Sequence, residues 1–195
     1  MLPLLLALLQ SPADTSSAYS GRARRLDVAI PRLDQDAAPG VDGALDEPVW
    51  RRAARLTGFS QYRPVDGRPA EDSTEVLVWY AADAIWFGVR AFEAHGDVVR
   101  ATLADRDQID ADDYVRVLLD TYDDRRRALL FAVNPLGVQQ DGVWSDGVDA
   151  TAGGAGAGFR FDATIDINPD YVFDSKGRVT PWGYEVEVRI PFKSI

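Results

Sequence analysis

The sequence predicts an all-β protein, an antiparallel β-sandwich with jelly-roll or immunoglobulin-like layering and one or two short helices. Short runs rich in β-branched and aromatic residues recur along the chain, turn-forming residues separate them, and a strand–helix–strand rhythm is lacking. In the clearest run, 184–190, apolar residues alternate with Glu185, Glu187 and Arg189. Such alternation is typical of a strand with one face in a core and the other in water. We therefore expect both glutamates at the surface.

The N-terminus resembles an export signal. Residues 1–9 are almost wholly apolar, but the run is much shorter than the roughly 20 residues that span a bilayer. Small residues at 16–18 offer a cleavage site, although no basic residue precedes the leucines. We expect residues 1–18 to be a signal peptide; the alternative is a floppy apolar terminus of a cytoplasmic protein. Residues 19–40 are polar and broken by prolines, which predicts a linker or a first short strand at 26–30.

The body of the chain is expected from residue 41 onward. A helical turn is predicted at 46–54, where Asp46 can cap and Pro48 suits the first turn, and a second short helix is predicted at 98–103. The glycine- and alanine-rich stretch 152–158 predicts a flexible loop. Further strands are expected at 75–80, 85–89, 114–120, 129–134, 138–144 and 159–162.

Composition excludes several kinds of chemistry. The 195 residues contain no cysteine, which rules out disulfides, thiolate metal sites and cysteine nucleophiles. The single histidine, His95, rules out a zinc site of several imidazoles, and it lacks a recognisable serine motif beside it. The net charge of −10 disfavours nucleic acid as a partner.

Three motifs in order suggest a family. They are Val41-Asp42-Gly43-Ala44-Leu45-Asp46-Glu47-Pro48-Val49-Trp50, the hairpin 75–89, and Gly183-Tyr184-Glu185-Val186-Glu187-Val188-Arg189-Ile190-Pro191-Phe192. Together they resemble the carbohydrate-binding module family 9 fold over residues 41–195. Two further stretches, 120–126 and 131–142, resemble the version of this fold that stands at the front of large exported bacterial proteins with a barrel-like C-terminal domain. The resemblance implies an antiparallel sandwich and a chain that stops before its final strand.

The resemblance and the composition together indicate candidate sugar-binding residues. Sugars bind aromatic faces and polar groups. Trp144 and Trp182 lie among glycine and proline residues and are the stacking candidates, while Asn134 and Gln139 are the polar candidates. The remaining tryptophans are expected in the core: Trp50, Trp79 and Trp86.

Two positions depart from the pattern of glycan-binding members. Asp110 stands where those members have a tryptophan, and Arg116 stands where they have a strand glutamate. Asn134, by contrast, matches an asparagine of those members. The departures bear on the ligand and leave the predicted fold unaffected.

An acidic loop suggests calcium, which the resembled family often carries as a structural ion. Carboxylates at this density are hard oxygen ligands, although the spacing is not that of an EF-hand. The alternative is a solvated acidic loop. The five candidate ligands are Asp105, Asp107, Asp110, Asp112 and Asp113.

The sequence thus predicts a non-catalytic glycan-binding module of a larger protein linked to carbohydrate catabolism. Its expected partners are a glycan or glycoconjugate and its own C-terminal domain, in the periplasm, outer membrane or extracellular space. One alternative is a structural domain that docks on an outer-membrane-type domain without binding sugar. Another is part of a glycoside hydrolase, whose catalytic residues are then expected outside this segment. Glu185 and Glu187 have a spacing that a carboxylate pair could use, but they are expected to be an ordinary charged strand face.

Overall fold

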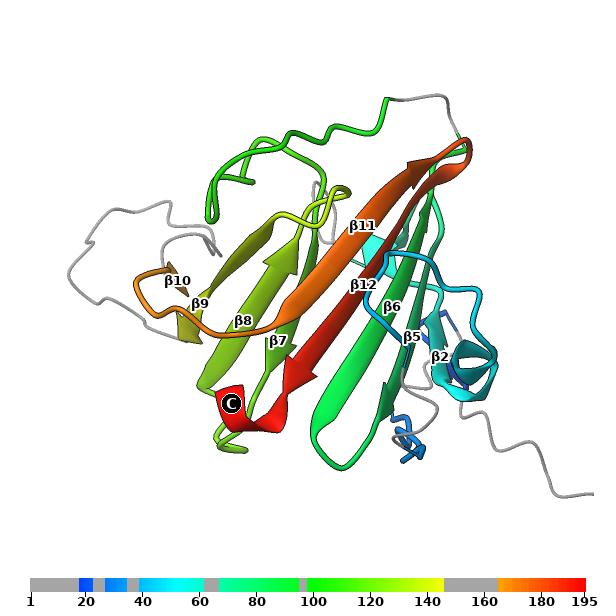
Figure 1. The fold of residues 1–195 in the computed structure, drawn as a ribbon. Coiled ribbons are helices and arrows are strands. Elements are labelled where there is room, and N and C mark those ends of the chain that lie inside the picture. Colours follow the sequence, from blue (N-terminus) through cyan, green and yellow to red (C-terminus); the bar gives the residue numbers. More distant parts are fainter. Residues whose placement is uncertain (1–17, 23–26, 35–38, 62–66, 95–97, 146–164) are drawn as a thin grey trace, which may run out of the picture.

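Two sheets that pack face to face form the protein, with a small ribbon beside them (Figure 1). The computed structural model describes residues 18–22, 27–34, 39–61, 67–94, 98–145 and 165–195. In spatial order, the six-stranded sheet contains β1 (Ala18–Ser20), β2 (Ala54–Thr57), β5 (Thr74–Tyr80), β6 (Ala84–Phe92), β12 (Gly183–Pro191) and β11 (Asp174–Thr180). The four-stranded sheet contains β10 (Ile165–Asp166), β9 (Gln139–Ser145), β8 (Arg127–Val133) and β7 (Val115–Leu119). The ribbon pairs β3 (Ser60–Gln61) with β4 (Arg68–Pro69).

The predicted fold class is confirmed. Every neighbouring pair of strands is antiparallel except β1 and β2, which run parallel. Six predicted strands are present as β5, β6, β7, β8, β9 and β12. Among the described residues, no helix has the length and hydrophobicity needed to cross a bilayer.

The main core lies between the two sheets. Strand β12 contributes Val186, Val188 and Ile190, all of them buried, as its alternation predicts. Across the sandwich, Phe131 of β8 meets the ring of Phe173 edge-on, with ring centroids 5.2 Å apart. Alternate residues of neighbouring strands meet here because side chains on one strand point to one face at every second position.

The outer face of the six-stranded sheet is also buried, which corrects one expectation. Glu185 and Glu187 are only 4% and 0% exposed. The segment that precedes β2 lies over them and includes the 3₁₀ helix η2 (Pro48–Arg52). The second core beneath it contains Leu33, Leu45, Val49, Trp50, Ala53, Leu77, Trp79, Ala81, Ala84 and Trp86. Alternation predicted correctly which residues share a face, but a separate segment determines whether that face meets water.

The helical turn predicted at 46–54 is present as the 3₁₀ helix η2, but its N-cap is Glu47 and not Asp46. The second helix, predicted at 98–103, was wrong. Residues 98–103 form no helix; the backbone N–H groups of Arg100 and Thr102 bind carboxylates at Asp113 and Asp112 and hold this stretch as a loop.

Other expectations concern the segment before residue 41 and the parts that are not described. Residues 27–30 form no strand, but Arg32 bridges to Tyr80 and Leu33 enters the second core, so part of the expected linker packs on the sheet. Residues 1–17 of the predicted signal 1–18 lie outside the described residues, as do loop 152–158, strand 159–162 and His95; Ala18 begins β1.

Three glycines mark the point where the two sheets and the N-terminal segment meet. A Cβ on Gly177 of β11 would lie 2.4 Å from the carbonyl oxygen of Pro135, and one on Gly137 would lie 2.9 Å from the Cα of Lys176. A Cβ on Gly43 would lie 3.2 Å from the backbone nitrogen of Gly177. Gly43 and Gly137 also have φ angles of +88° and +87°, which favour glycine. The Asp42-Gly43 turn and the Pro135-Leu136-Gly137 turn therefore fit against β11 because the three glycines at the contact have no side chains.

This contact predicts that Gly177→Ala destabilises the fold. The new methyl group would have to displace the backbone at Pro135, so we expect the free energy of unfolding to fall by about 2–3 kcal/mol. Urea denaturation measures it. Gly40→Ala is the matched control, because its Cβ would meet nothing within 4 Å. Equal stability of the two variants would show that β11 and the 135–137 turn are not in tight contact.

Candidate functional site

A stack of tryptophans forms the centre of the second core. Trp79 and Trp86 lie parallel, with ring centroids 5.2 Å apart and planes 6° apart, and Trp50 meets Trp79 edge-on. Arg189 places its guanidinium over the other face of Trp86, 5.6 Å from the ring centroid. All three tryptophans are buried, as predicted. Their faces are therefore occupied within the protein and are not open to a sugar.

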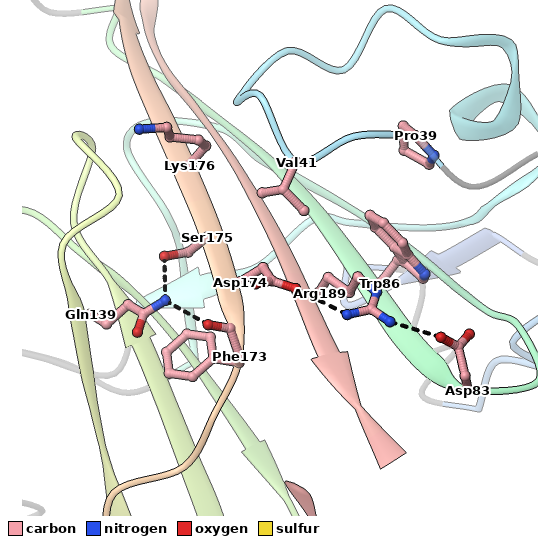
Figure 2. Close-up of a pocket in the computed structure, with 10 residues that line it drawn as sticks. All are labelled: Pro39, Val41, Asp83, Trp86, Gln139, Phe173, Asp174, Ser175, Lys176 and Arg189. Atoms are coloured by element: carbon pink, nitrogen blue, oxygen red, sulfur yellow. Dashed lines mark hydrogen bonds and ion pairs between the residues drawn. The ribbon is translucent and has the colours of Figure 1, made fainter. Parts of the chain in front are cut away.

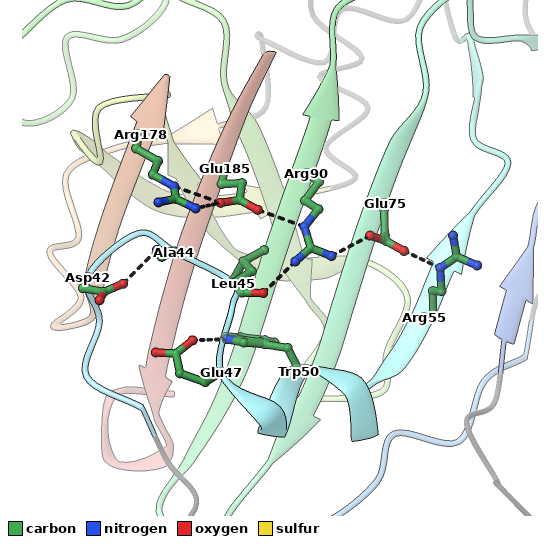
Figure 3. A network of polar contacts seen from close by, with 10 residues as sticks. All are labelled: Asp42, Ala44, Leu45, Glu47, Trp50, Arg55, Glu75, Arg90, Arg178 and Glu185. Atoms are coloured by element: carbon green, nitrogen blue, oxygen red, sulfur yellow. Dashed lines mark hydrogen bonds and ion pairs between the residues drawn. The ribbon is translucent and has the colours of Figure 1, made fainter. Parts of the chain in front are cut away.

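A row of alternating charges crosses the same outer face, perpendicular to the strands (Figure 3). Arg178, Glu185, Arg90 and Glu75 lie directly opposite one another on β11, β12, β6 and β5, and Arg55 of β2 completes the row. Arg90 bonds to Glu185 at 2.9 Å and Glu75 at 3.0 Å. We call these five residues the charge ladder.

Ion pairs within the charge ladder offset the cost of burying its carboxylates. Burial alone would raise the pKa of Glu75, but the hydrogen bonds and charges of Arg55 and Arg90 bring that pKa below its usual value. Glu185 bonds to Arg90 on one side and to Arg178 on the other, at 2.6 Å. Arg90 also donates to the carbonyl oxygen of Leu45, which ties the covering segment to the ladder.

Glu187 lies one row away from the ladder, and no arginine or lysine in the described part of the chain forms an ion pair with it. Its Oε2 accepts hydrogen bonds from the backbone N–H groups of Asp42 at 2.9 Å and Gly43 at 3.2 Å. Its Oε1 finds no hydrogen-bond partner among the described residues. Burial raises the pKa of Glu187 to about 7; the two backbone hydrogen bonds oppose this shift, and the nearby Glu47 and Asp42 add to it.

A groove of about 700 Å³ lies beside these rows, where the N-terminal segment approaches the edge strand β11 (Figure 2). Its floor is a third row of directly opposed residues, Asp174, Arg189 and Trp86, on β11, β12 and β6. Arg189 bonds to Asp174 at 3.0 Å and to Asp83 at 2.7 Å, so both carboxylates are fixed. The lining residues are Pro39, Val41, Asp83, Trp86, Gln139, Phe173, Asp174, Ser175, Lys176 and Arg189.

The polar side chains on the β11 side of the groove are also held in place. Gln139 donates to the carbonyl oxygen of Phe173 and to the Oγ of Ser175, both at 2.9 Å, and accepts from Arg106. Lys176 is exposed at the rim. Ser175 in turn donates to the carbonyl oxygen of Gly137, so its hydroxyl and the amide of Gln139 are both engaged within the protein. The groove thus offers mainly the carboxylates of Asp83 and Asp174 and the ammonium group of Lys176 to a ligand.

Of the four predicted sugar-binding residues, the structure brings only Gln139 to this groove. Asn134 is fully buried, and its side-chain amide is saturated. It donates to the carbonyl oxygen of Thr102 and to Asp112, and accepts from the backbone N–H groups of Leu136 and Val138. It therefore holds the turn after β8.

The two predicted stacking tryptophans lie far from each other. Trp144 lies near the end of β9, on the face opposite to that of Val143, which packs on the main core. Trp182 lies in the β11–β12 turn, where its ring packs at 5.0 Å on that of Phe92. The end of β9 and this turn lie at opposite ends of the sandwich (Figure 1). The two rings therefore do not form one sugar site.

The acidic loop does not assemble a set of metal ligands. Asp112 accepts from Thr102 and Asn134, Asp113 accepts from the backbone of Arg100, and Asp110 accepts from Gln140. Asp107 accepts from the backbone N–H of Asp141, and Asp105 accepts through its backbone carbonyl. Among the described residues, no group of three or more acidic or histidine side chains is placed to hold a metal ion. The described geometry thus does not fit a calcium site, and calcium binding stays a prediction.

The two departures from the glycan-binding pattern lie together on the outer face of the four-stranded sheet. Arg116 stacks on Tyr114, 4.9 Å from its ring centroid, and approaches Gln140, which also binds Asp110. The fully buried Ile109 packs beside them on β8. Protein side chains therefore fill much of this face.

Comparisons with known proteins support the fold. No family model matches the sequence, and no curated protein matches it significantly. Two solved structures of a family 9 carbohydrate-binding module from Caldicellulosiruptor kristjanssonii are similar, one in complex with cellotriose and one in complex with glucose. The first has a TM-score of 0.50 and 17% identity over 82% of this chain and 66% of that chain. The second has a TM-score of 0.50 and 18% identity over 83% and 69%.

These matches confirm the expected resemblance at the level of fold: the chain is a sandwich like that of family 9 modules. It spans about two thirds of the length of those structures.

Most of the groove was not predicted from the sequence. Asp83, Asp174, Lys176 and Arg189 come from a hairpin turn, an edge strand and a central strand, and no local motif links them. Strand β11 itself escaped prediction, because its sequence Asp-Ser-Lys-Gly-Arg-Val-Thr lacks apolar alternation. The one sequence pattern that pointed to a groove residue was the charged face of 184–190, which includes Arg189.

The charge ladder predicts unequal costs for its arginines. Arg90→Gln would leave Glu185 and Glu75 buried without their shared cation, so we expect the free energy of unfolding to fall by about 2–3 kcal/mol. Arg55→Gln is the matched control. Its side chain is 58% exposed, against 27% for Arg90, and we expect it to cost less than about 1 kcal/mol. Urea denaturation of both variants tests the difference, and equal costs would contradict this account of the ladder.

Proposed function

We propose that the chain is a non-catalytic carbohydrate-binding module that holds a sugar in the groove along β11. The groove is the observation that carries the proposal. Its volume of about 700 Å³ lies in the range of small-molecule sites, and its polar groups are fixed by bonds within the protein. The fold adds support, since the similar family 9 modules were solved with cellotriose and with glucose.

The chemistry of the groove suits sugar hydroxyl groups, which both donate and accept hydrogen bonds. Asp83 and Asp174 each keep one carboxylate oxygen that makes no hydrogen bond to Arg189, and Lys176 offers a donor at the rim. Fixed side chains lose little entropy when a ligand binds. Stacking contributes little here, because Trp86 and Phe173 are only 3% and 5% exposed. We therefore propose hydrogen bonding as the main source of affinity.

Burial of the two strand glutamates supports a role without catalysis. A glycosidase needs two carboxylates that reach the scissile bond from opposite sides. Glu185 is enclosed between Arg90 and Arg178, and Glu187 lies beneath Asp42 and Gly43. The expectations that the chain is exported, is part of a larger protein of carbohydrate catabolism and packs on a C-terminal domain stay predictions.

The groove predicts which substitutions weaken sugar binding. Asp174→Ala and Lys176→Ala each remove a charged hydrogen-bonding group from the groove, so we expect the dissociation constant for cello-oligosaccharides to rise about tenfold. Isothermal titration calorimetry measures it. Asp170→Ala is the control, because Asp170 is an exposed acid that does not line the groove.

A second control separates this site from the predicted stacking residues. Trp144→Ala and Trp182→Ala should leave the affinity unchanged, since neither residue lines the groove. Loss of binding in these tryptophan variants, with normal binding in the groove variants, would move the sugar site away from β11. Absence of binding to every sugar of a glycan array would refute the proposed function.

A further inference from the structure

Glu187 connects the centre of the six-stranded sheet to one wall of the groove. It lies directly opposite Gly88 of β6 and Lys176 of β11, and it is completely buried. Gly88 has no side chain, and a Cβ there would lie 2.7 Å from Leu45, so the covering segment lies close to the sheet at this point. Glu187 is therefore in position to hold that segment.

The covering segment is held through its backbone. Residues 39–47, which we call the strap, contain the Asp42-Gly43 turn whose two N–H groups bind Glu187 Oε2. The turn is already shaped by its own residues, because Asp42 accepts from the N–H of Ala44 at 2.8 Å and Gly43 has a φ of +88°. Its attachment at this point thus depends on one buried carboxylate.

The strap also forms a wall of the groove. Val41, next to Asp42 in the chain, and Pro39 line the groove opposite Lys176 and Asp174 (Figure 2). Movement of the Asp42-Gly43 turn away from Glu187 would therefore move this wall. We infer that Glu187 is a positioning residue, a pH-dependent latch that closes the strap wall of the groove when its carboxyl group is protonated and loosens it when the group is ionised.

The pH at which the strap closes follows from the linkage between protonation of Glu187 and opening of the strap. In the closed state the carboxyl group of Glu187 is buried, its Oε1 has no hydrogen-bond partner among the described residues, and burial raises the pKa of Glu187 to about 7. When the strap is lifted, water reaches the carboxylate and its pKa returns toward 4.5. A group whose pKa is higher in the closed state favours closure at low pH, and this advantage is lost as the pH rises toward 7. Closure is thus favoured in acid and opening in mild base.

Charged groups on every adjoining element surround this carboxyl group. The strap contributes Asp42, Asp46 and Glu47; β11 contributes Lys176 and Arg178; β12 contributes Glu185 and Arg189; and β6 contributes Arg90. Arg178 forms an ion pair with Glu185, and Arg90 forms ion pairs with Glu185 and Glu75. Arg189 forms ion pairs with Asp174 and Asp83. Asp42 and Glu47 instead push the pKa of Glu187 further up. The three arginines are thus committed to other carboxylates. Lys176 lies directly opposite Glu187 but is exposed, whereas Asp42 and Glu47 favour protonation of Glu187.

Backbone amide exchange tests the latch without any ligand. From pKa values of 4.5 and about 7, the opening equilibrium at the Asp42 and Gly43 amides should rise about tenfold between pH 6 and pH 8, after correction for intrinsic exchange. Glu187→Gln, which cannot ionise, should abolish this pH dependence. Glu185→Gln, the same change two residues along the strand, should keep it. Opening that does not change with pH in the unsubstituted protein, or that still changes with pH in Glu187→Gln, would overturn the inference.

The consequence for binding rests on the proposed function and is measured separately. Calorimetry with cellotriose should give a lower dissociation constant at pH 6 than at pH 8 for the unsubstituted protein, and a ratio near one for Glu187→Gln. If no sugar binds at either pH while the amide exchange behaves as expected, the proposed function fails and the latch stands. If sugar binds with the same pH ratio in both proteins, the latch does not control the groove.

Discussion

The attachment of the strap to the outer face of the six-stranded sheet governs most of what this molecule can do. Two backbone N–H groups meet the buried carboxylate of Glu187, and Arg90 bonds to the carbonyl oxygen of Leu45. Beneath the strap and η2 lie the tryptophan stack and the inner part of the charge ladder, and at its edge lies the groove. A face that a two-sheet sandwich would leave in water therefore becomes a second interior, and the polar groups on it need partners there.

The fold class could be predicted from the sequence because strands are recognised from short local patterns of apolar and polar residues. Period-two alternation in β12 and apolar runs in β5 and β6 identify strands. Burial of Trp79 and Trp86 follows from their place in those runs, and burial of Trp50 follows from its place in the 41–50 motif. The same reasoning placed Glu185 and Glu187 in water, because alternation carries no information about a segment that returns to cover the outer face. Strand β11 was not predicted because an edge strand can consist of polar residues and glycine, which give no apolar alternation.

The candidate site was less predictable for a related reason. Its parts come from the strap, the β5–β6 hairpin, the start of β9, β11 and β12, and no two of these share a motif. Gln139 was singled out by sequence and does line the groove, whereas Asn134 proves to be a structural residue that holds a turn. Polar side chains that bind ligands and those that hold turns are the same residue types, so only the partners seen in the structure distinguish them.

The charge ladder has a consequence for the order in which the sheet is assembled. The hairpin β5–β6 contains Glu75 beside Arg90, and the hairpin β11–β12 contains Arg178 beside Glu185. Each pair forms within a hairpin whose strands are near in sequence, whereas Arg90 and Glu185 lie 95 residues apart. The two hairpins are electrically complementary, since the arginine of one faces the glutamate of the other where β6 meets β12. We infer that they form first and dock second, with the central ion pair closing last and selecting the register of the longest strand pairing in the sheet.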